Sequence, residues 1–413
     1  MGVDGEPRAD WAEIDIRVGH AFRPATPIDQ RALFAGRTAQ IREVLDCIGQ
    51  SGQHAIIFGE RGVGKTSLAN VLHEFLQPIG NHWLVVKTNC DSADDFTSTW
   101  RKVFAEVDLM REMPGTGLKG AVQREPFSAQ DLLGDRVRPN DIRRVLARLG
   151  VHAIVILDEF DRLAGETVPL LADTVKTLSD TATPATLILV GVADSVDELV
   201  IEHASIERAI VQIRMPRMSP NELVEIVLRG LGSVGMTIEL HALELVASLS
   251  QGLPHYTHLL GLHAARHAID SRRLQVSRED VRKAISSAVQ RAQESIQFAY
   301  HTATMSPRPD NLYKQVLLAC ALAPTDERGY FAAADVRAPM SAIKRRRYEI
   351  SAFSQHLNNF CDPGRGAILQ KTGTRRRYRF RFSNPLMQPY VIMRGLDSRM
   401  ISEKTVQELG KAI

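Results

Sequence analysis

Residues 54–76 read HAIIFGERGVGKTSLANVLHEFL, and this stretch decides the fold. An apolar run, His54–Phe58, is followed by a glycine-rich turn and then by helical spacing of apolar residues from Lys65 to Leu76. The turn matches the pattern GxxxxGK followed by Ser or Thr, placed between a strand and a helix as the pattern requires. Its glycines let backbone N–H groups turn around phosphates, and the helix N-terminus adds partial positive charge. The stretch predicts a phosphate-binding loop whose nucleotide contacts are Gly59, Glu60, Arg61, Gly62, Val63, Gly64, Lys65, Thr66 and Ser67.

A second motif supplies carboxylates. Residues 153–159 read AIVILDE, an apolar strand that ends in Asp158 and Glu159 at the same sheet edge as the phosphate loop. We expect Lys65 to reach the β- and γ-phosphates, and Thr66 and Asp158 to hold Mg²⁺. Glu159 would orient and deprotonate the attacking water. The two motifs predict ATP and Mg²⁺ as cofactors and ATP hydrolysis as the reaction; the alternative is a nucleotide-binding switch that hydrolyses little.

Further apolar runs indicate the fold class. They recur at residues 84–86, 153–157 and 187–192, with helical patterns between them, which predicts an α/β fold with a parallel sheet covered on both faces. Residues 111–140 are rich in Gly and Pro and weakly periodic, so we expect a surface insertion there. Strand signals end by residue 220, and residues 220–297 read as consecutive helices.

Composition sets further limits. The 413 residues are 44% hydrophobic and 24% charged, which is typical of a globular protein of two or three domains. No apolar run approaches the ~18–20 residues of a membrane span, so no membrane partner is expected. The four cysteines lie far apart and form no CxxC motif, which argues against a disulfide scaffold or an obvious zinc site and favours the cytoplasm.

The positive charge is concentrated near the C-terminus. The chain carries a net charge of +3, yet residues 340–382 alone contain eleven Lys or Arg and only two Asp or Glu. Such asymmetry indicates a segment that contacts an anion, for which nucleic acid is the usual candidate.

With these motifs, the chain resembles the AAA+ ATPases over about residues 20–395, and within them both the origin-recognition-like initiators and the STAND signalling ATPases. The resemblance implies a P-loop NTPase parallel sheet with a helical lid, followed by a C-terminal winged helix-turn-helix domain. The expected boundaries are an N-terminal tail at 1–19, the nucleotide-binding domain at 20–218, the lid at 219–300, the winged helix at 301–395 and a C-terminal tail at 396–413.

The resemblance also implies residues around the nucleotide. The sequence FAGR at 34–37 resembles the family segment beside the adenine, so Pro27, Ile28 and Phe34 are candidate adenine contacts, with ordinary packing as the alternative. Asp194 aligns with the sensor that is usually Asn or Thr. Because an ionised carboxylate only accepts hydrogen bonds and repels phosphate, either Asp194 acts through water or metal, or sensing is altered.

Two more positions follow from the same resemblance. Arg208, just before an apolar strand, matches the arginine finger that completes a neighbouring subunit's site, with Arg214 and Arg217 as competitors and a structural salt bridge as the alternative. The sequence GLP at 252–254 resembles the STAND motif whose proline packs on adenine, and His255 stands where initiators place a sensor arginine. Pro254 and His255 are therefore candidate nucleotide contacts; a simple proline-started helix is the alternative.

The basic section reads as a winged helix. Helices are expected at 310–323, 330–336 and 351–360, then a hairpin whose second strand, 375–382, alternates aromatic residues inward with arginines outward. Tyr378, Phe380 and Phe382 would share the inner face. In such a domain the second helix of the turn reads base edges and the wing grips the backbone. The candidate DNA contacts are Gln355 and Asn358 for bases, and Lys344, Arg345, Arg375, Arg377, Arg379 and Arg381 for phosphates.

These observations lead to one main hypothesis and two rivals. The main one is an AAA+ ATPase whose nucleotide state controls homo-oligomer assembly and engagement of duplex DNA through residues 340–382. The first rival is a STAND-type ATP/ADP switch whose winged helix docks a protein, for example an ATPase subunit serving a separately encoded effector or recombinase in transposition or defence. The second is a nucleotide-binding adaptor that does not hydrolyse ATP.

Overall fold

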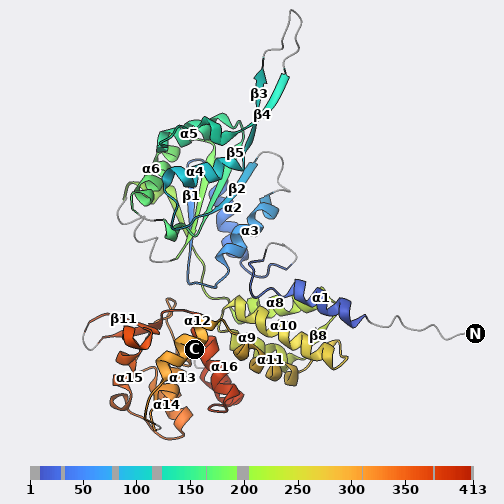
Figure 1. Ribbon diagram of the computed structural model, residues 1–413, viewed down its shortest axis with the longest axis vertical. Coiled ribbons are helices and arrows are strands. Elements are labelled where there is room, and N and C mark those ends of the chain that lie inside the picture. Colours follow the sequence, from blue (N-terminus) through green and yellow to red (C-terminus); the bar gives the residue numbers. More distant parts are fainter. Residues whose placement is uncertain are drawn as a thin grey trace, which may run out of the picture. The chain divides into compact units, whose positions relative to one another are not determined.

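The computed structural model describes residues 10–28, 33–76, 83–113, 123–163, 165–192, 204–308, 310–374 and 377–410. They form two compact units (Figure 1). The sheet unit comprises residues 27–60 and 64–215, and the helical unit comprises residues 1–26, 61–63 and 216–413. Over the described residues, no helix combines the length and apolar character needed to span a membrane.

The core of the sheet unit is a five-stranded parallel sheet in the order β2-β5-β6-β1-β7. Its strands are β1 (His54–Phe58), β2 (Trp83–Asn89), β5 (His152–Asp158), β6 (Ala185–Gly191) and β7 (Ile210–Arg214). Its helices are α2 (Thr38–Ile48), α3 (Lys65–Leu76), α4 (Phe96–Ala105), α5 (Pro139–Arg148) and α6 (Thr167–Asp180). The predicted parallel sheet is confirmed, with β1, β5 and β6 at the apolar runs that the sequence marks.

Helices cover both faces of the sheet. Alternate residues of β5, Val155 and Leu157, enter one apolar cluster with Trp100 of α4, Ile142 of α5 and Val175 of α6. The intervening β5 residues point to the opposite face, where α2 and α3 lie (Figure 1). Because every β5 residue from Ala153 to Asp158 is buried, the strand reads as a continuous apolar run rather than an alternating one.

The predicted surface insertion at 111–140 contains a β-hairpin and a 3₁₀ turn that the sequence did not indicate. Strands β3 (Asp108–Met113) and β4 (Gln123–Ser128) pair antiparallel and project from the sheet unit (Figure 1). A 3₁₀ turn, Ala129–Leu132, then leads back to α5, with Ala129 and Val137 buried in the core. The hairpin occupies only part of this segment, and the many glycines and prolines of the whole segment did not indicate strands.

The helical unit begins with the N-terminal segment. Helix α1 (Trp11–Ala21) is capped by Asp10 and packs on α8 and α10, so the expected tail at 1–19 is wrong for its second half. Phe22 then fills the space left by Gly230 and Gly261, where any Cβ would overlap its ring. The glycines of α8 and α10 thus allow the N-terminal segment to approach the two helices closely.

Consecutive helices follow, as predicted for 220–297. They are α8 (Pro220–Gly232), α9 (Leu240–Ser250), α10 (Pro254–Asp270), α11 (Arg278–Gln290) and α12 (Glu294–Thr304). A two-residue parallel pair, β8 (Thr237–Ile238) with β9 (Gln275–Val276), joins the α8–α9 and α10–α11 connections and was not predicted.

The C-terminal part has the arrangement of a winged helix. Its elements are α13 (Tyr313–Ala321), β10 (Phe331–Ala332), α14 (Arg337–Lys344), α15 (Ser354–Asn359), β11 (Leu369–Thr372) and β12 (Arg379–Phe382). The three strands pair antiparallel in the order β10-β12-β11. The helix expected at 330–336 is wrong: this segment holds β10, and the second helix starts at Arg337.

The chain does not end in the expected tail at 396–413. Helix α16 (Met387–Asp397) is largely buried, and α17 (Glu403–Gly410) follows it. Glu403 accepts hydrogen bonds from Arg278 and Arg282 of α11 at 2.6 Å each. These two arginines hold the pKa of Glu403 below its usual value against the opposing effect of burial. The C-terminal residues are thus part of the helical unit.

Candidate functional site

The phosphate loop follows β1, as predicted. Gly62 and Gly64 have φ values of 87° and 96°, a left-handed conformation that side chains disfavour. A Cβ on Gly59 would overlap the carbonyl oxygen of Met215, so this glycine permits close backbone approach. Helix α3 then begins at Lys65, which places the loop at its N-terminus. The loop therefore has the backbone form that a phosphate cradle needs.

Lys65 folds back over this loop. Its Nζ donates to the carbonyl oxygens of Gly59 at 3.0 Å and Glu60 at 2.9 Å. The ammonium group thus lies over the loop, where an anion would meet it. Beside it, the Thr66 hydroxyl donates to Asp158 Oδ1 across 3.5 Å, which brings the two predicted metal ligands together.

Asp158 is the most buried acid of the site, with 2% of its surface exposed. Oδ1 accepts from Thr66 and from the backbone N–H of Glu159 at 3.0 Å. Among the described residues, the buried Oδ2 has no hydrogen-bond partner, although Lys87 Nζ lies 3.1 Å from it. A hydroxyl and one carboxylate suit Mg²⁺, which keeps several waters and takes few protein ligands. The described residues contain no cluster of three or more His, Cys, Asp or Glu that could hold a metal ion.

Glu159 leaves the strand in a left-handed conformation, with φ of 56°. Its side chain is 49% exposed, and Oε2 accepts from Arg162 at 2.9 Å. Sequence reasoning missed Arg162, although the three-residue spacing within one turn is a usable signal. To take a proton from water, the carboxylate must share or leave this ion pair.

The candidate adenine contacts differ in environment. Ile28 and Phe34 are buried, whereas Pro27 is exposed. The backbone N–H of Ile28 donates to the Ser67 hydroxyl at 3.1 Å, which ties this segment to the first turn of α3. Ile28 therefore lies beside the first turn of α3, and its contact with adenine stays a prediction.

The sensor and finger positions are only partly described. Asp194 lies outside the described residues. Arg208 lies in a 3₁₀ turn before β7, is 87% exposed, and reaches only to 4.0 Å from Asp180. Its competitor Arg217 donates to Gln251 O at 3.2 Å and to Gln388 Oε1 at 2.6 Å within its own unit. The exposure of Arg208 leaves it more available to another molecule than Arg217.

The GLP motif opens α10, with Pro254 in its first turn. His255 Nδ1 lies 2.7 Å from the carbonyl oxygen of Pro24; because a carbonyl only accepts, Nδ1 carries the hydrogen. Burial lowers the pKa of His255, an effect partly opposed by this hydrogen bond, so the ring favours the neutral form. The motif is therefore anchored to the segment that follows α1.

The predicted DNA surface carries many internal contacts. Arg379 pairs with Asp326 at 3.3 Å, and Arg381 donates to Gln370 at 2.9 Å. Lys371 donates to Asn358 Oδ1 at 3.2 Å, which ties α15 to the hairpin. Gln355 donates to Asn359 within α15 at 3.0 Å. Arg375 lies outside the described residues.

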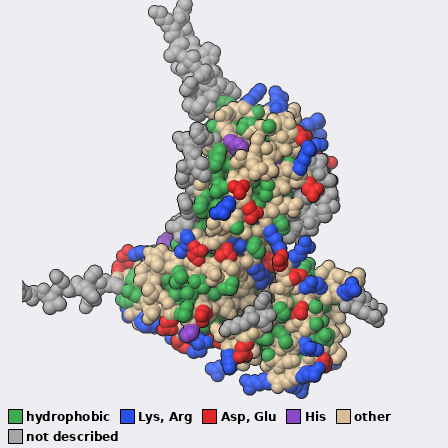
Figure 2. Space-filling view, turned by 180° about the vertical axis from the view of Figure 1, so that it is seen from behind, with side chains coloured by type: hydrophobic (Ala, Val, Ile, Leu, Met, Phe, Trp, Pro, Cys, Tyr) green, Lys and Arg blue, Asp and Glu red, His purple; other side chains and the backbone are tan. Residues whose placement is uncertain are grey.

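The aromatic face of the hairpin was predicted correctly for two of three residues. Phe380 and Phe382 are buried, but Tyr378 is 37% exposed, with Lys371 over its ring. The reason is that β12 starts at Arg379, so Tyr378 lies before the strand. Arg377 is exposed. Figure 2 shows Lys and Arg side chains along the outer edge of this part of the chain, with acidic side chains among them.

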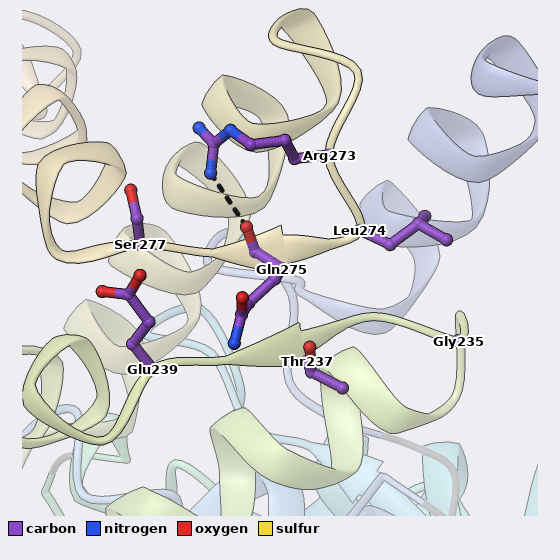
Figure 3. Close-up of a pocket in the computed structure, with 7 residues that line it drawn as sticks. All are labelled: Gly235, Thr237, Glu239, Arg273, Leu274, Gln275 and Ser277. Carbon is purple, nitrogen blue, oxygen red and sulfur yellow. Dashed lines mark hydrogen bonds between the residues drawn. The ribbon is translucent and has the colours of Figure 1, made fainter.

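Hollows elsewhere do not coincide with the nucleotide motifs. One, of about 760 Å³, surrounds the β8–β9 pair, and Figure 3 shows Arg273 directed at the Gln275 carbonyl oxygen there. Arg273 also forms a two-bond pair with Asp280. A second, of about 740 Å³, lies between α11, α14 and residues 396–405 and includes Arg345 beside the Arg278–Glu403 pair.

Comparisons with known proteins agree with this geometry. Residues 33–190 match the AAA ATPase domain family. No curated protein matches the chain. The fold resembles the ORC2 protein of Aeropyrum pernix, solved as ADPNP–ADP complexes, with a TM-score of 0.50 and 15% identity over 95% of this chain and 98% of that one. It also resembles the Walker-type ATPase paby2304 of Pyrococcus abyssi, with a TM-score of 0.50 and 16% identity over 90% and 99%.

At these identities the solved structures show the fold, whereas the family match covers the phosphate loop and the Asp158–Glu159 motif. Residues 33–190 thus form a domain that matches the AAA ATPase family, and the fold of the chain resembles that of the Aeropyrum pernix ORC2 protein.

Proposed function

We propose that this AAA+ protein binds and hydrolyses ATP and uses its nucleotide state to control self-assembly and DNA engagement through the winged helix. The observation that carries the catalytic part is the contact between Thr66 Oγ1 and Asp158 Oδ1, 3.5 Å apart. It unites the phosphate loop and the acidic strand end at one sheet edge, where in-line phosphoryl transfer needs both.

Each residue of the site has its own role in the proposed reaction. Lys65 and the loop N–H groups bind the phosphates and balance their charge. Thr66 and Asp158 would hold Mg²⁺, which would neutralise part of the phosphate charge. Glu159 accepts the proton of the attacking water, and its ion pair with Arg162 holds the carboxylate in one orientation until then.

Assembly follows from the exposed arginine. Among the described residues, Arg208 pairs only with Asp180, at 4.0 Å, and most of its side chain is exposed. An exposed guanidinium group can pair with the negative charge on the phosphoryl group that is transferred in a neighbouring subunit. We propose that ATP-bound subunits assemble so that Arg208 completes the next site.

DNA engagement is supported by the winged-helix arrangement and by the eleven basic and two acidic residues at 340–382. Arg377 is exposed just before β12. Lys344 is the last residue of α14, and Arg345 is its C-cap. A backbone-gripping wing with short α15 beside it favours phosphate contacts over extensive base reading.

A second function is favoured by one observation. Arg379 and Arg381 already have partners within the chain, which lowers the charge free to meet DNA. A STAND-type switch, in which this surface docks a protein such as a separately encoded effector or recombinase, would fit that pairing and the GLP motif.

One experiment separates the two functions. Molecular mass and duplex DNA binding are measured with ATP, ADP or no nucleotide at several salt concentrations. Wild-type DNA binding should weaken with salt at about −0.9 log units per phosphate contact, and changing Arg377, Arg379 and Arg381 to Gln should flatten that slope by up to about 2.7. The matched control changes Arg143, Arg144 and Arg148 of α5 to Gln and should leave the slope unchanged. Absence of salt-sensitive DNA binding in every nucleotide state would favour the protein-docking switch.

A further inference from the structure

Lys87 of β2 faces the metal carboxylate. Its Nζ lies 3.1 Å from Asp158 Oδ2 on the neighbouring strand β5, in a register that pairs Asn89 with Asp158. The same Nζ donates to Asn89 Oδ1 at 2.8 Å. Lys87 is 23% exposed and Asp158 is 2% exposed, so the pair lies at the edge of the buried site.

The contact is an ion pair at 3.1 Å. Within the described part of the chain, Oδ2 has no hydrogen-bond partner. Lys87 therefore supplies positive charge to a buried carboxylate, while one of its three N–H groups donates to Asn89. A buried carboxylate without a counter-charge is destabilised, and the nearby ammonium group of Lys87 offsets that cost.

We propose that Lys87 is a positioning residue that acts through Asp158 and sets how much Mg²⁺ the nucleotide site requires. This inference rests on the proposed Mg²⁺–nucleotide function. A cation that arrives at Asp158 meets a second positive charge beside it, so Lys87 competes with Mg²⁺ for the same carboxylate. The long, partly exposed side chain can retreat toward Asn89 and solvent when Mg²⁺ enters.

Three variants test this. Lys87→Met removes charge and hydrogen bond, Lys87→Gln removes the charge but keeps a donor for Asn89, and Lys87→Arg keeps the charge. The matched control is Lys102→Met, because Lys102 of α4 also bridges carboxylates, but those of Asp91 and Asp94 rather than that of Asp158. Binding of a fluorescent ADP analogue is titrated against Mg²⁺, and melting temperature is measured with ADP in the presence and absence of Mg²⁺.

The Mg²⁺ concentration for half-maximal ADP binding should fall about tenfold in the Met and Gln variants and change little in the Arg and Lys102 variants. Without Mg²⁺ the Met and Gln variants should melt at lower temperature, and Mg²⁺ should raise their melting temperature more than that of wild type. The Gln variant decides the question if the Met variant does not fold.

Unchanged Mg²⁺ dependence in a folded, charge-removing variant would mean that Lys87 only braces β2 against β5. Weaker ADP binding without Mg²⁺ would place Lys87 on the phosphates instead. Either result overturns the inference while leaving the proposed function standing. A wild-type protein that binds no ADP at any Mg²⁺ concentration would overturn both.

Discussion

The hydroxyl of Tyr256 donates a 2.6 Å hydrogen bond to the carbonyl oxygen of Leu386. Tyr256 follows His255 in the first turn of α10, and Leu386 immediately precedes α16. Burial raises the pKa of the Tyr256 phenol, so the group stays protonated as a donor. Nearby, Arg217 donates to Gln388, whose amide in turn donates to Ala321 O of α13 at 2.9 Å. The first turn of α10, which follows the GLP motif, is thus joined to the start of α16, and Gln388 of α16 in turn contacts α13.

Changing Tyr256 to Phe should lower the free energy of unfolding by about 1–2 kcal/mol, because it removes the donor while the Leu386 carbonyl stays in place. Urea unfolding measured by circular dichroism gives this value. Tyr378→Phe is the control: its ring is 37% exposed, and its change should stay within about 0.5 kcal/mol. Equal effects of the two substitutions would show that the hydrogen bond from Tyr256 to Leu386 adds nothing to the free energy of unfolding.

Acid should destabilise both units. Burial lowers the pKa of His54 in the sheet unit and of His258 in the helical unit from 6.5 to about 4. The unfolded chain therefore binds more protons between pH 6.5 and 4, so the stability is present above pH 6.5 and is lost as pH falls toward 4. At pH 5 each histidine should lower the free energy of unfolding by about 2 kcal/mol.

Unfolding free energies at pH 7 and pH 5 check this expectation. In His258→Phe, which keeps the edge-on contact with Phe22, the loss between the two pH values should shrink by about 2 kcal/mol. His241→Gln, at an exposed position of α9, should retain the full loss. The same pH dependence in all three proteins would mean that His258 does not cause it.

The arginine finger makes a prediction about mixtures. Arg208→Ala protein should bind ATP normally, because its own phosphate loop is intact, yet hydrolyse it poorly. Adding Glu159→Gln protein, which still supplies Arg208, should restore part of the turnover in mixed assemblies. Steady-state phosphate release measures both. Wild-type turnover by Arg208→Ala alone would contradict a role for this arginine between subunits.

The sequence predicted the parts of the fold that repeat a local pattern. His54–Phe58 and Ala153–Asp158 are continuous apolar runs, so their strands and the parallel sheet could be read directly. The hairpin at β3–β4 could not, because its six-residue strands flank a Gly-rich stretch without a detectable period, and β10 could not, because two residues are too few to show one. Helix α17 was missed because its anchor, Glu403, binds arginines more than 120 residues away.

The same division applies to the site. Residues within one motif, such as Lys65 and Thr66, follow from spacing alone. Lys87 does not, because its importance arises from the pairing of β2 with β5, and neither strand's sequence specifies its neighbour. Arg379 and Arg381 were expected to face solvent by alternation, but their partners Asp326 and Gln370 come from other segments of the winged helix.

ATP turnover tests the central claim most directly. ATP binding and phosphate release are measured for wild type, Glu159→Gln, Lys65→Ala and the control Glu166→Gln, an exposed acid near the end of the same loop. Wild type and the control should hydrolyse ATP. Glu159→Gln should bind ATP with unchanged affinity but lose about 100-fold or more of its turnover, because an amide cannot accept the proton, and Lys65→Ala should lose binding. Turnover equal to wild type in both the Glu159 and Lys65 variants would contradict the assignment of this site as an ATPase centre.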